Sequence, residues 1–259
     1  MSIHPSAIID PRAKIHETAV VGPFCVIGPD VTIGPGNQLA NNVTIQGRTE
    51  IGPDNRIGAF ATLGMPAQDK THRDDDCQTL IGQGNDIREY VSVHRGTDKG
   101  GGITRIGDFN QIFVYSHFAH DTQVGSKCMF ANCTTLAGHV IIGDCVVTGG
   151  FAGFHQFTRV GSYCMIGAMS ALFQDAPPYV ICTGPRAQAK GINLIGLQRN
   201  GFDETQTDLV QEVYNRYFCS GLIPAKALAA VEEISDNSEL FTRFIDFVKT
   251  SKRGLVTRG

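Results

Sequence analysis

The stretch IHPSAI-IDPRAK-IHETAV-VGPFCV-IGPDVT-IGPGNQ, residues 3–38, repeats every six residues. Each hexad begins with an aliphatic residue, and its fifth residue is small or short. A fixed short period is the signature of a repeat protein, in which each unit packs only against its neighbours. The register holds without a slip to Gln68, and the eleven leading residues are Ile3, Ile9, Ile15, Val21, Ile27, Ile33, Leu39, Ile45, Ile51, Ile57 and Leu63.

A period of six does not suit an amphipathic helix, whose apolar face returns every 3.6 residues. It suits short strands joined by turns, with the leading residue and the fifth residue facing inwards. Three such strands make one triangular coil of 18 residues, and successive coils stack at the strand spacing of about 4.8 Å. One coil buries little by itself, so many are needed. The repeat therefore predicts a parallel β-solenoid.

Two segments interrupt the pattern, at residues 69–80 (DKTHRDDDCQTL) and 99–105 (KGGGITR). Hexads led by Ile81, Ile87 and Val93 lie between them, and twelve more run from Ile106 to Leu172 with only Thr148 departing from an apolar lead. We expect both segments to be loops that leave the prism. Insertions in a solenoid this regular usually serve binding.

The repeat is expected to end at Asp175-Ala176-Pro177-Pro178, because paired prolines cannot continue a strand ladder. The apolar period then becomes helical, which predicts three helices within residues 203–251. We divide the chain into a β-helix at 1–184 and a connecting segment with a C-terminal α-helical domain at 185–259. The expected helix starts are marked by Asp203, Pro224 and Ser238.

The composition excludes several classes of protein. The net charge of −3 gives no reason to expect nucleic acid as a partner. No signal peptide and no apolar run of about 20 residues is visible, so we expect no membrane span and a cytoplasmic location. The eight cysteines include no C-x-x-C, and we interpret them as free thiols. No ATP or NAD motif appears, and no bound cofactor is expected.

The 18-residue coil also serves as a ruler. His120, Gly138 and Gln156 are spaced 18 apart with no insertion between them, so they are predicted to form a column at one corner. Asp121 and His139 fall in the adjacent column, and His117 precedes them in the same segment.

This group suits acyl transfer. A neutral imidazole at His120 can remove the proton from an attacking hydroxyl, and Asp121 can orient the ring. A glycine allows close approach, so the Gly138 N–H can donate to a developing oxyanion. His117, His139 and Gln156 would line the site.

Two other interpretations stay open at this point. Corner positions are polar by default, so the residues could be exposed turns of a purely structural solenoid. His117, His120 and His139 could instead ligate zinc, as in a metal-dependent hydratase. A regular prism with a polar loop beside a histidine cluster favours a catalytic site over both.

Several segments resemble the UDP-N-acetylglucosamine O-acyltransferase family, which begins lipid A synthesis. The resemblance covers almost the whole chain, and its most specific part is the HxxHD segment combined with AGHV and HQF. The matching segments are Ile87–Glu89, Val93–Thr97, His117–Asp121, Leu136–Val140, His155–Phe157 and Gln174–Val180.

The resemblance implies a left-handed parallel β-helix followed by helices, and a homotrimer with active sites between subunits. It implies transfer of a 3-hydroxyacyl group from acyl carrier protein, where phosphopantetheine carries it, to the 3-hydroxyl of UDP-GlcNAc. The family's general base falls on His120, with Asp121 in support and the Gly138 amide facing the thioester oxygen. The implied sugar contacts are Gln68, Asp69, His117, His139 and Gln156, and the implied nucleotide contacts are Asn193 and Arg199.

The chain departs from the family at three positions. Ile195 and Asn200 replace an acidic and a basic residue that many members carry, so a 3-amino sugar nucleotide stays an alternative acceptor. Ala168 stands where long-chain enzymes have glycine, which predicts a shorter or narrower acyl chain. A related N-acyltransferase of the same pathway is another alternative, although it carries an extra N-terminal domain whereas here the repeat begins at Ile3.

Overall fold

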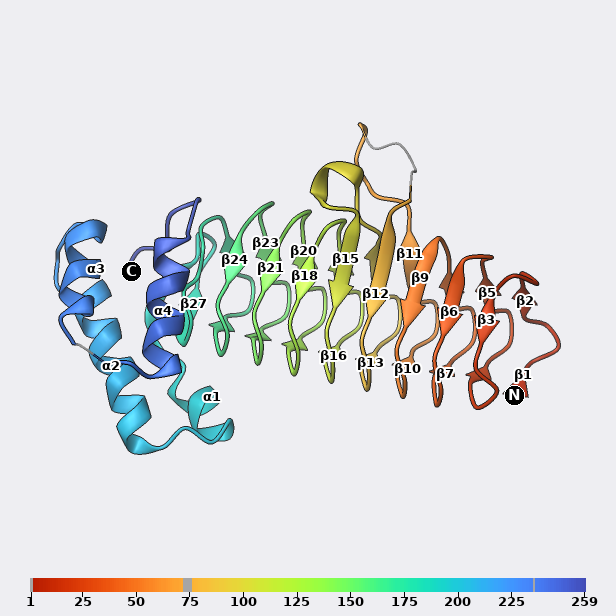
Figure 1. Ribbon diagram of the computed structural model, residues 1–259, viewed down its shortest axis with the longest axis horizontal. Helices are drawn as coiled ribbons and strands as arrows, with labels where there is room; N and C mark the ends of the chain where they lie inside the picture. The colour runs from red at the N-terminus through yellow and green to blue at the C-terminus, as the bar shows by residue number, and fades with distance from the viewer. Residues whose placement is uncertain (1, 72–75, 235) are drawn as a thin grey trace.

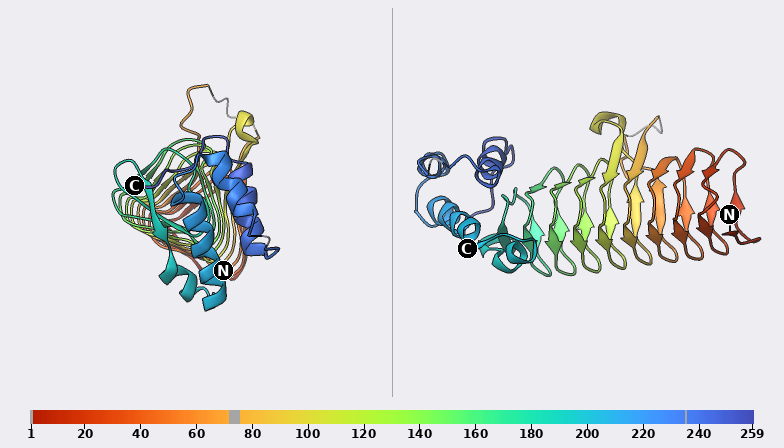
Figure 2. Two further views of the ribbon diagram at one scale, coloured as in Figure 1. Left: turned by 90° about the vertical axis from the view of Figure 1, so that its left-hand side faces the viewer. Right: turned by 60° about the horizontal axis from the view of Figure 1, so that its bottom comes forward.

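The computed structural model describes residues 2–71, 76–234 and 236–259. The chain winds into a long triangular prism with helices at its C-terminal end (Figure 1). Viewed along the prism, the coils superimpose as nested triangles (Figure 2). Three sheets form the sides, and from β1 to β26 neighbouring strands of a sheet are parallel and three places apart in the chain. The predicted solenoid is confirmed.

Each sheet takes one strand from almost every coil. The 11-stranded sheet contains β1 (Ser2–Ile3), β4 (Val20–Val21), β7 (Gln38–Leu39), β10 (Arg56–Ile57), β13 (Asp86–Ile87), β16 (Gln111–Ile112), β19 (Met129–Phe130), β22 (Val147–Thr148), β25 (Met165–Ile166), β27 (Val180–Thr183) and β28 (Gln188–Ile192). The 9-stranded sheet contains β2 (Ile8–Ile9), β5 (Val26–Ile27), β8 (Thr44–Ile45), β11 (Thr62–Met65), β14 (Ser92–His94), β17 (His117–Phe118), β20 (Thr135–Leu136), β23 (Gly153–Phe154) and β26 (Ala171–Leu172). The 8-stranded sheet contains β3 (Lys14–Ile15), β6 (Val31–Ile33), β9 (Arg48–Ile51), β12 (Gln78–Ile81), β15 (Ile103–Ile106), β18 (Gln123–Val124), β21 (Ile141–Ile142) and β24 (Arg159–Val160).

The leading residues of the hexads form the core of the prism. From Val21 to Leu172 every one of them is at most 4% exposed. Burial of one such aliphatic or aromatic side chain contributes about 1.5–3 kcal/mol, which is how a ladder of two-residue strands is stabilised. The polar lead Thr148 is accommodated because its hydroxyl lies 2.8 Å from the hydroxyl of Thr134.

An asparagine ladder fills the fifth hexad position at the corner that follows the 8-stranded sheet. The side-chain oxygen of Asn37 accepts the backbone N–H of Asn55 at 3.0 Å, and Asn55 accepts that of Asn85 at 2.9 Å. The ladder continues through Asn110 and ends at the N–H of Cys128. These amides satisfy buried turn groups that no strand pairing reaches. In most hexads the fifth position therefore holds a small side chain, whereas at this corner it holds an amide that forms hydrogen bonds.

The two insertions are shorter than the sequence predicts. Strand β12 takes in residues 78–80 of the first, and β15 takes in residues 103–105 of the second. The predicted ends at 80 and 105 are therefore wrong by three residues. The reason is that Thr79 and Thr104, rather than apolar residues, fill the buried fifth position of these coils. Residues 72–75 of the first insertion lie outside the described residues.

Thr79 offers a stability prediction. Its hydroxyl is buried and makes no hydrogen bond within the described part of the chain. We expect Thr79→Val to raise the free energy of unfolding by about 1 kcal/mol, because an apolar group of the same shape removes an unsatisfied donor. Urea unfolding measures this change. The matched variant is Thr49→Val, in the coil next to that of Thr79. It loses a 2.7 Å bond to the Gln46 carbonyl of its own turn and should be destabilised instead. A loss of stability in Thr79→Val would contradict the assignment.

The prism ends in a hairpin formed by β27 and β28. After the paired prolines, β27 still adds in parallel to β25, and only β28 reverses direction. Strand β27 lies before the predicted domain boundary at 184/185 and β28 lies after it, and this division stays a prediction. Strand pairing therefore continues past Pro178, contrary to our expectation that the repeat ends there.

Four α-helices follow in the described part of the C-terminal segment, and three of them are the predicted ones. They begin as expected at Asp203, whose side chain forms a capping box, at Pro224 and at Ser238. The remaining helix, α1, comes first in the chain. It is short, and the sequence pattern did not predict it. Within the described residues, no helix combines the length and apolar character that crossing a membrane requires. The bounds are α1 (Leu194–Arg199), α2 (Glu204–Phe218), α3 (Pro224–Glu232) and α4 (Glu239–Lys249).

Candidate active site

The candidate site lies at the corner between the 9-stranded and 8-stranded sheets. The turn from β17 to β18 carries His120 and Asp121, and the turn from β20 to β21 carries Gly138. Strands β17, β20 and β23 pair with an offset of 18 residues, as the ruler requires. A Cβ atom placed on Gly138 would lie 2.6 Å from Cε1 of His120, so any larger residue would clash with the imidazole. Within the described chain the Gly138 N–H donates to no protein acceptor.

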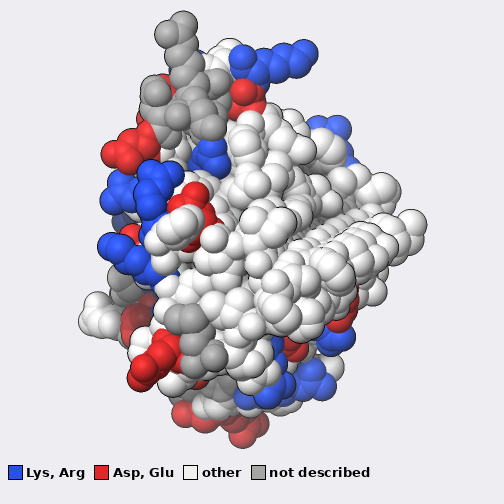
Figure 3. Space-filling model, turned by 90° about the vertical axis from the view of Figure 1, so that its right-hand side faces the viewer, with Lys and Arg blue, Asp and Glu red and all other residues white. Residues whose placement is uncertain are grey.

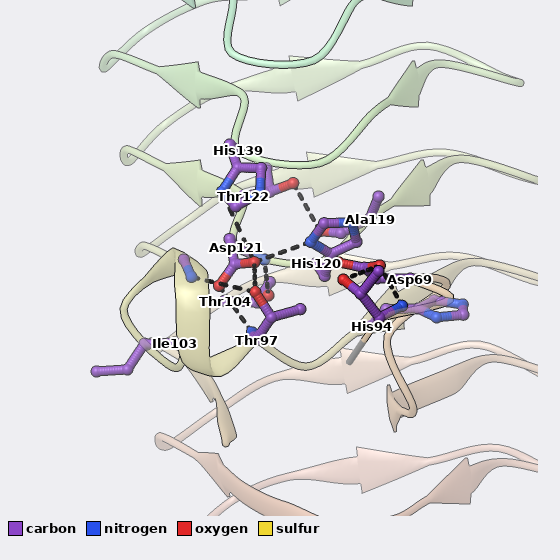
Figure 4. Close-up of polar contacts among 12 residues, drawn as sticks. Asp69, His94, Thr97, Ile103, Thr104, Ala119, His120, Asp121, Thr122 and His139 are labelled. Atoms are coloured by element: carbon purple, nitrogen blue, oxygen red, sulfur yellow. Dashed lines mark hydrogen bonds and ion pairs between the residues drawn. The ribbon is translucent and has the colours of Figure 1, made fainter. Parts of the chain in front are cut away.

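His120 and Asp121 form a buried hydrogen-bonded pair (Figure 4). Nδ1 of His120 lies 2.8 Å from Oδ2 of Asp121, and the residues are 8% and 3% exposed. An ionised carboxylate only accepts hydrogen bonds, so Nδ1 carries the proton of a neutral ring. Nε2 then keeps its lone pair, which is the state a general base needs.

Thr97, which lies just before the second insertion, holds Asp121 from the other side. The backbone N–H of Thr97 donates to Oδ1 at 2.8 Å, and its hydroxyl donates to Oδ2 at 2.7 Å. Thr97 also caps the 3-10 turn η1 (Asp98–Gly100), whose last residue packs against the carboxylate so closely that no Cβ fits at Gly100. The hydroxyl of Thr104 accepts the N–H of Asp121 at 2.7 Å. Asp121 is therefore fixed by residues of the repeat on both sides of the second insertion, with Gly100 of the insertion packed against its carboxylate.

The first insertion covers the site. Asp69 accepts the backbone N–H and the hydroxyl of Thr71, and these bonds lower the pKa of its carboxyl below the usual value. Lys99 of the second insertion donates to the Thr71 hydroxyl at 2.9 Å, which joins the two loops. Together they border a cleft of about 700 Å³, lined by Gln68, Asp69, Lys70, Thr97, Lys99, Gly100, His120, His139, Gln156 and Phe157.

His139 forms one wall of the cleft. Its ring stacks on Phe157 with centroids 4.4 Å apart and stands edge-on to His120 at 5.0 Å. Burial lowers its pKa, although the nearby carboxylate of Asp121 opposes the shift. A neutral ring at this position can donate or accept one hydrogen bond to a polar ligand.

His117 lies on β17 and does not line this cleft. Its Nδ1 is 2.7 Å from the hydroxyl of Ser92, and its ring stands edge-on to His94 at 5.1 Å. Burial, and secondarily the charge of His94, lower the pKa of His117 to about 4. His117 is therefore neutral at physiological pH.

The shift at His117 predicts how stability depends on pH. The unfolded ring has a pKa near 6.5 and the folded ring one of about 4, so the unfolded state binds more protons between these values. The free energy of unfolding should therefore fall as the pH falls from about 6.5 to 4. Urea titrations should show a shallower fall in His117→Gln, with the exposed His16→Gln as a control. Equal slopes in all three proteins would contradict the assigned shift.

Three of the residues selected from the resemblance lie away from the cleft within one chain. Asn193 is 7% exposed and caps α1, where its amide also donates to the carbonyl of Tyr163. Arg199 ends the same helix. Ala168 is exposed in the turn after β25, at the corner that follows the 11-stranded sheet.

The histidines do not form the zinc set considered above. Among the described residues, the group that places possible ligand atoms within 4.8 Å of one another is His120, Asp121 and His139. His117 is not part of it, because its Nδ1 faces Ser92. Both oxygens of Asp121 already accept hydrogen bonds, from Thr97 and from the His120 ring. A hydrogen-bonded dyad accounts for the cluster.

Sequence reasoning missed the residues that the insertions contribute. Thr97, Lys99, Lys70 and Gly100 border the cleft, but the ruler cannot relate them to His120 because an insertion intervenes. The available signal was that Thr97 is a fifth hexad residue placed directly before a break. Phe157 was within reach, since it lies 18 residues after His139.

Comparison with known proteins agrees with the fold and with the resemblance. A family model described as "Udp N-acetylglucosamine O-acyltransferase; Domain 2" matches residues 175–256, and a bacterial transferase hexapeptide model matches residues 12–47 and 30–64. The structural matches below support the predicted left-handed β-helix with C-terminal helices.

Relatives match over the full length. An acyl-[acyl-carrier-protein]–UDP-N-acetylglucosamine O-acyltransferase of Burkholderia orbicola is 40% identical over 258 residues, 98% of each chain. A Francisella novicida UDP-N-acetylglucosamine acyltransferase has a TM-score of 0.96 and 37% identity, covering 98% of this chain and 94% of that one. The Moraxella catarrhalis O-acyltransferase has a TM-score of 0.96 and 39% identity, covering 99% and 100%. The chain belongs to the acyl-[acyl-carrier-protein]–UDP-N-acetylglucosamine O-acyltransferase family.

Proposed function

We propose that His120 is the general base for transfer of a 3-hydroxyacyl group from acyl carrier protein to the 3-hydroxyl of UDP-GlcNAc. As a member of its family, the protein is an acyl-carrier-protein-dependent acyltransferase of lipid A biosynthesis. The observation that carries the base assignment is the buried His120–Asp121 pair, which leaves Nε2 with a lone pair at the edge of a polar cleft. In lipid A synthesis, this transfer would be the first step.

The geometry supports a single base for both proton transfers. Nε2 of His120 takes the proton of the sugar hydroxyl while that oxygen attacks the thioester carbonyl. The Gly138 N–H donates to the resulting oxyanion. When the C–S bond breaks, protonated His120 returns the proton to the leaving thiolate, and Asp121 stabilises the imidazolium meanwhile.

We assign sugar binding to polar residues at the rim of the cleft. Gln68, Asp69, His139 and Gln156 line it and supply donors and acceptors for hydroxyl and amide groups. The ionised carboxylate of Asp69 can accept two sugar hydroxyls. His117 contacts the sugar only if the ligand extends beyond the cleft toward Ser92.

The remaining contacts require a second copy of the chain, and we assign the protein to homotrimers. Exposed apolar side chains repeat along the corner that carries Ala168, and a broad uncharged surface is visible from the N-terminal end (Figure 3). Such a surface marks an interaction site. Packing of this corner against the catalytic corner of the next copy brings Ala168 beside the acyl chain and Asn193 and Arg199 toward the nucleotide. The exposed residues are Phe24, Phe60, Tyr90, Tyr115, Phe151 and Met169.

We place the enzyme in the cytoplasm without a bound cofactor. All eight cysteines are free, which suits a reducing compartment. Phosphopantetheine arrives on the acyl carrier protein as part of the donor.

Purified protein tests the proposal with 3-hydroxyacyl carrier proteins of several chain lengths as donors. UDP-GlcNAc and its 3-amino analogue should be compared as acceptors. We expect transfer to UDP-GlcNAc to exceed transfer to the amine. A preference for the amine would replace the proposed acceptor, and no transfer from any donor would remove the proposal.

A further inference from the structure

Thr97 differs from four threonines at the fifth hexad position that share one hydrogen bond. In those four hexads the hydroxyl donates to the carbonyl three residues earlier, inside its own turn. Thr97 instead donates to Oδ2 of Asp121, in another turn of the prism. The four threonines are Thr49, Thr122, Thr134 and Thr158.

The surroundings of Thr97 fix the direction of this bond. The Thr97 hydroxyl accepts the N–H of Gly100 at 3.1 Å, so its own proton is free for the carboxylate. Its backbone N–H donates to the other carboxylate oxygen at 2.8 Å. Thr97 is 1% exposed, so water does not compete for these bonds. One residue therefore satisfies both oxygens of Asp121.

We propose that Thr97 is a positioning residue for the acyl transfer, which holds Asp121 so that its carboxylate fixes the His120 tautomer. This inference rests on the proposed role of His120. Thr97 and the adjoining second insertion then turn an ordinary corner of the prism into a catalytic one. Gly100 completes it, because its missing side chain lets the turn close over the carboxylate.

Loss of the hydroxyl has two consequences. The carboxylate can rotate, which displaces the imidazole from the acceptor hydroxyl. With one donor fewer, Asp121 also stabilises the protonated imidazole more strongly. The first effect lowers kcat, and the second moves the acid limb of the kcat/KM profile to higher pH. The KM for UDP-GlcNAc should stay unchanged, because the Thr97 hydroxyl is already hydrogen-bonded to Asp121.

The test compares Thr97→Val, Thr97→Ser and Thr79→Val with the wild-type protein. We expect Thr97→Val to lower kcat by about tenfold to a hundredfold, the cost of a small misplacement of a reacting group. Its KM should stay within about twofold and its acid limb should shift upward. Thr97→Ser, which keeps the hydroxyl, should restore kcat to within about threefold, and Thr79→Val should leave it unchanged. Wild-type kcat and pH profile in Thr97→Val, or no recovery in Thr97→Ser, would overturn the proposal.

A double-mutant cycle separates positioning from general damage. In an Asp121→Asn background, Thr97→Val should cost no more than about twofold, because the group it positions has already been lost. Additive losses would overturn the proposal. Should Thr97→Val fail to fold, Thr97→Ala removes the same hydroxyl and takes its place in the cycle. Full activity in His120→Ala would defeat the proposed function, whereas an inactive His120→Ala beside a normal Thr97→Val would defeat only this inference.

Discussion

His120→Ala is expected to lower kcat by about 10²–10⁴-fold, the usual contribution of a general base. The substitution removes the imidazole that contacts the Asp121 carboxylate on one side and packs against Gly138 on the other. The KM for UDP-GlcNAc should change little, because the cleft keeps its other polar residues. Steady-state transfer from acyl carrier protein measures both constants.

A matched control uses another histidine of the prism. His16 also sits at the start of a turn, where its ring contacts the hydroxyl of Thr18, but it lies far from the cleft in the N-terminal coils. His16→Ala should retain wild-type kcat. If His120→Ala keeps more than about a tenth of the wild-type kcat, His120 is not the base.

Asp121→Asn should have an effect of similar size although it preserves shape. The Thr97 N–H needs an acceptor at Oδ1, so the amide oxygen of the new residue takes that place and its NH₂ faces His120. The NH₂ then donates to Nδ1, which moves the imidazole proton to Nε2 and blocks the base. We expect a loss of about 10²–10⁴-fold in kcat with little change in KM.

Asp144→Asn is the control for this substitution. Asp144 also accepts a backbone N–H through Oδ1, from Ser126 at 2.7 Å, at a different corner. It should lose some stability but keep its activity. A kcat in Asp121→Asn within about threefold of wild type would show that the carboxylate does not set the tautomer.

The fold could be predicted because one physical rule governs most of the chain. Every coil must bury an aliphatic lead and a small fifth residue, so the period of six appears directly in the sequence. Prediction failed where polar contacts replace apolar ones. Thr79 and Thr104 fill buried positions without an apolar signal, and the short helix α1 is capped by Asn193 within a segment that has no clear period.

The candidate site was predictable where residues 18 apart stack on one another with no insertion between them. His120, Gly138 and Gln156 are related by coil stacking alone, and the strand register places them at one corner. Thr97 and Lys99 lie beyond an insertion, whose length removes the relation between sequence spacing and position. Asn193 and Arg199 rest on the resemblance, and in the proposed trimer their contact with the nucleotide depends on a neighbouring copy.

A crystal structure of Asp121→Asn with UDP-GlcNAc is the most direct test of the account. The substitution keeps the cleft while it slows the reaction. The account predicts the glucosamine 3-hydroxyl within hydrogen-bonding distance of His120 Nε2, about 2.6–3.2 Å. A sugar that presents another hydroxyl to His120, or binds at a different corner of the prism, would contradict it.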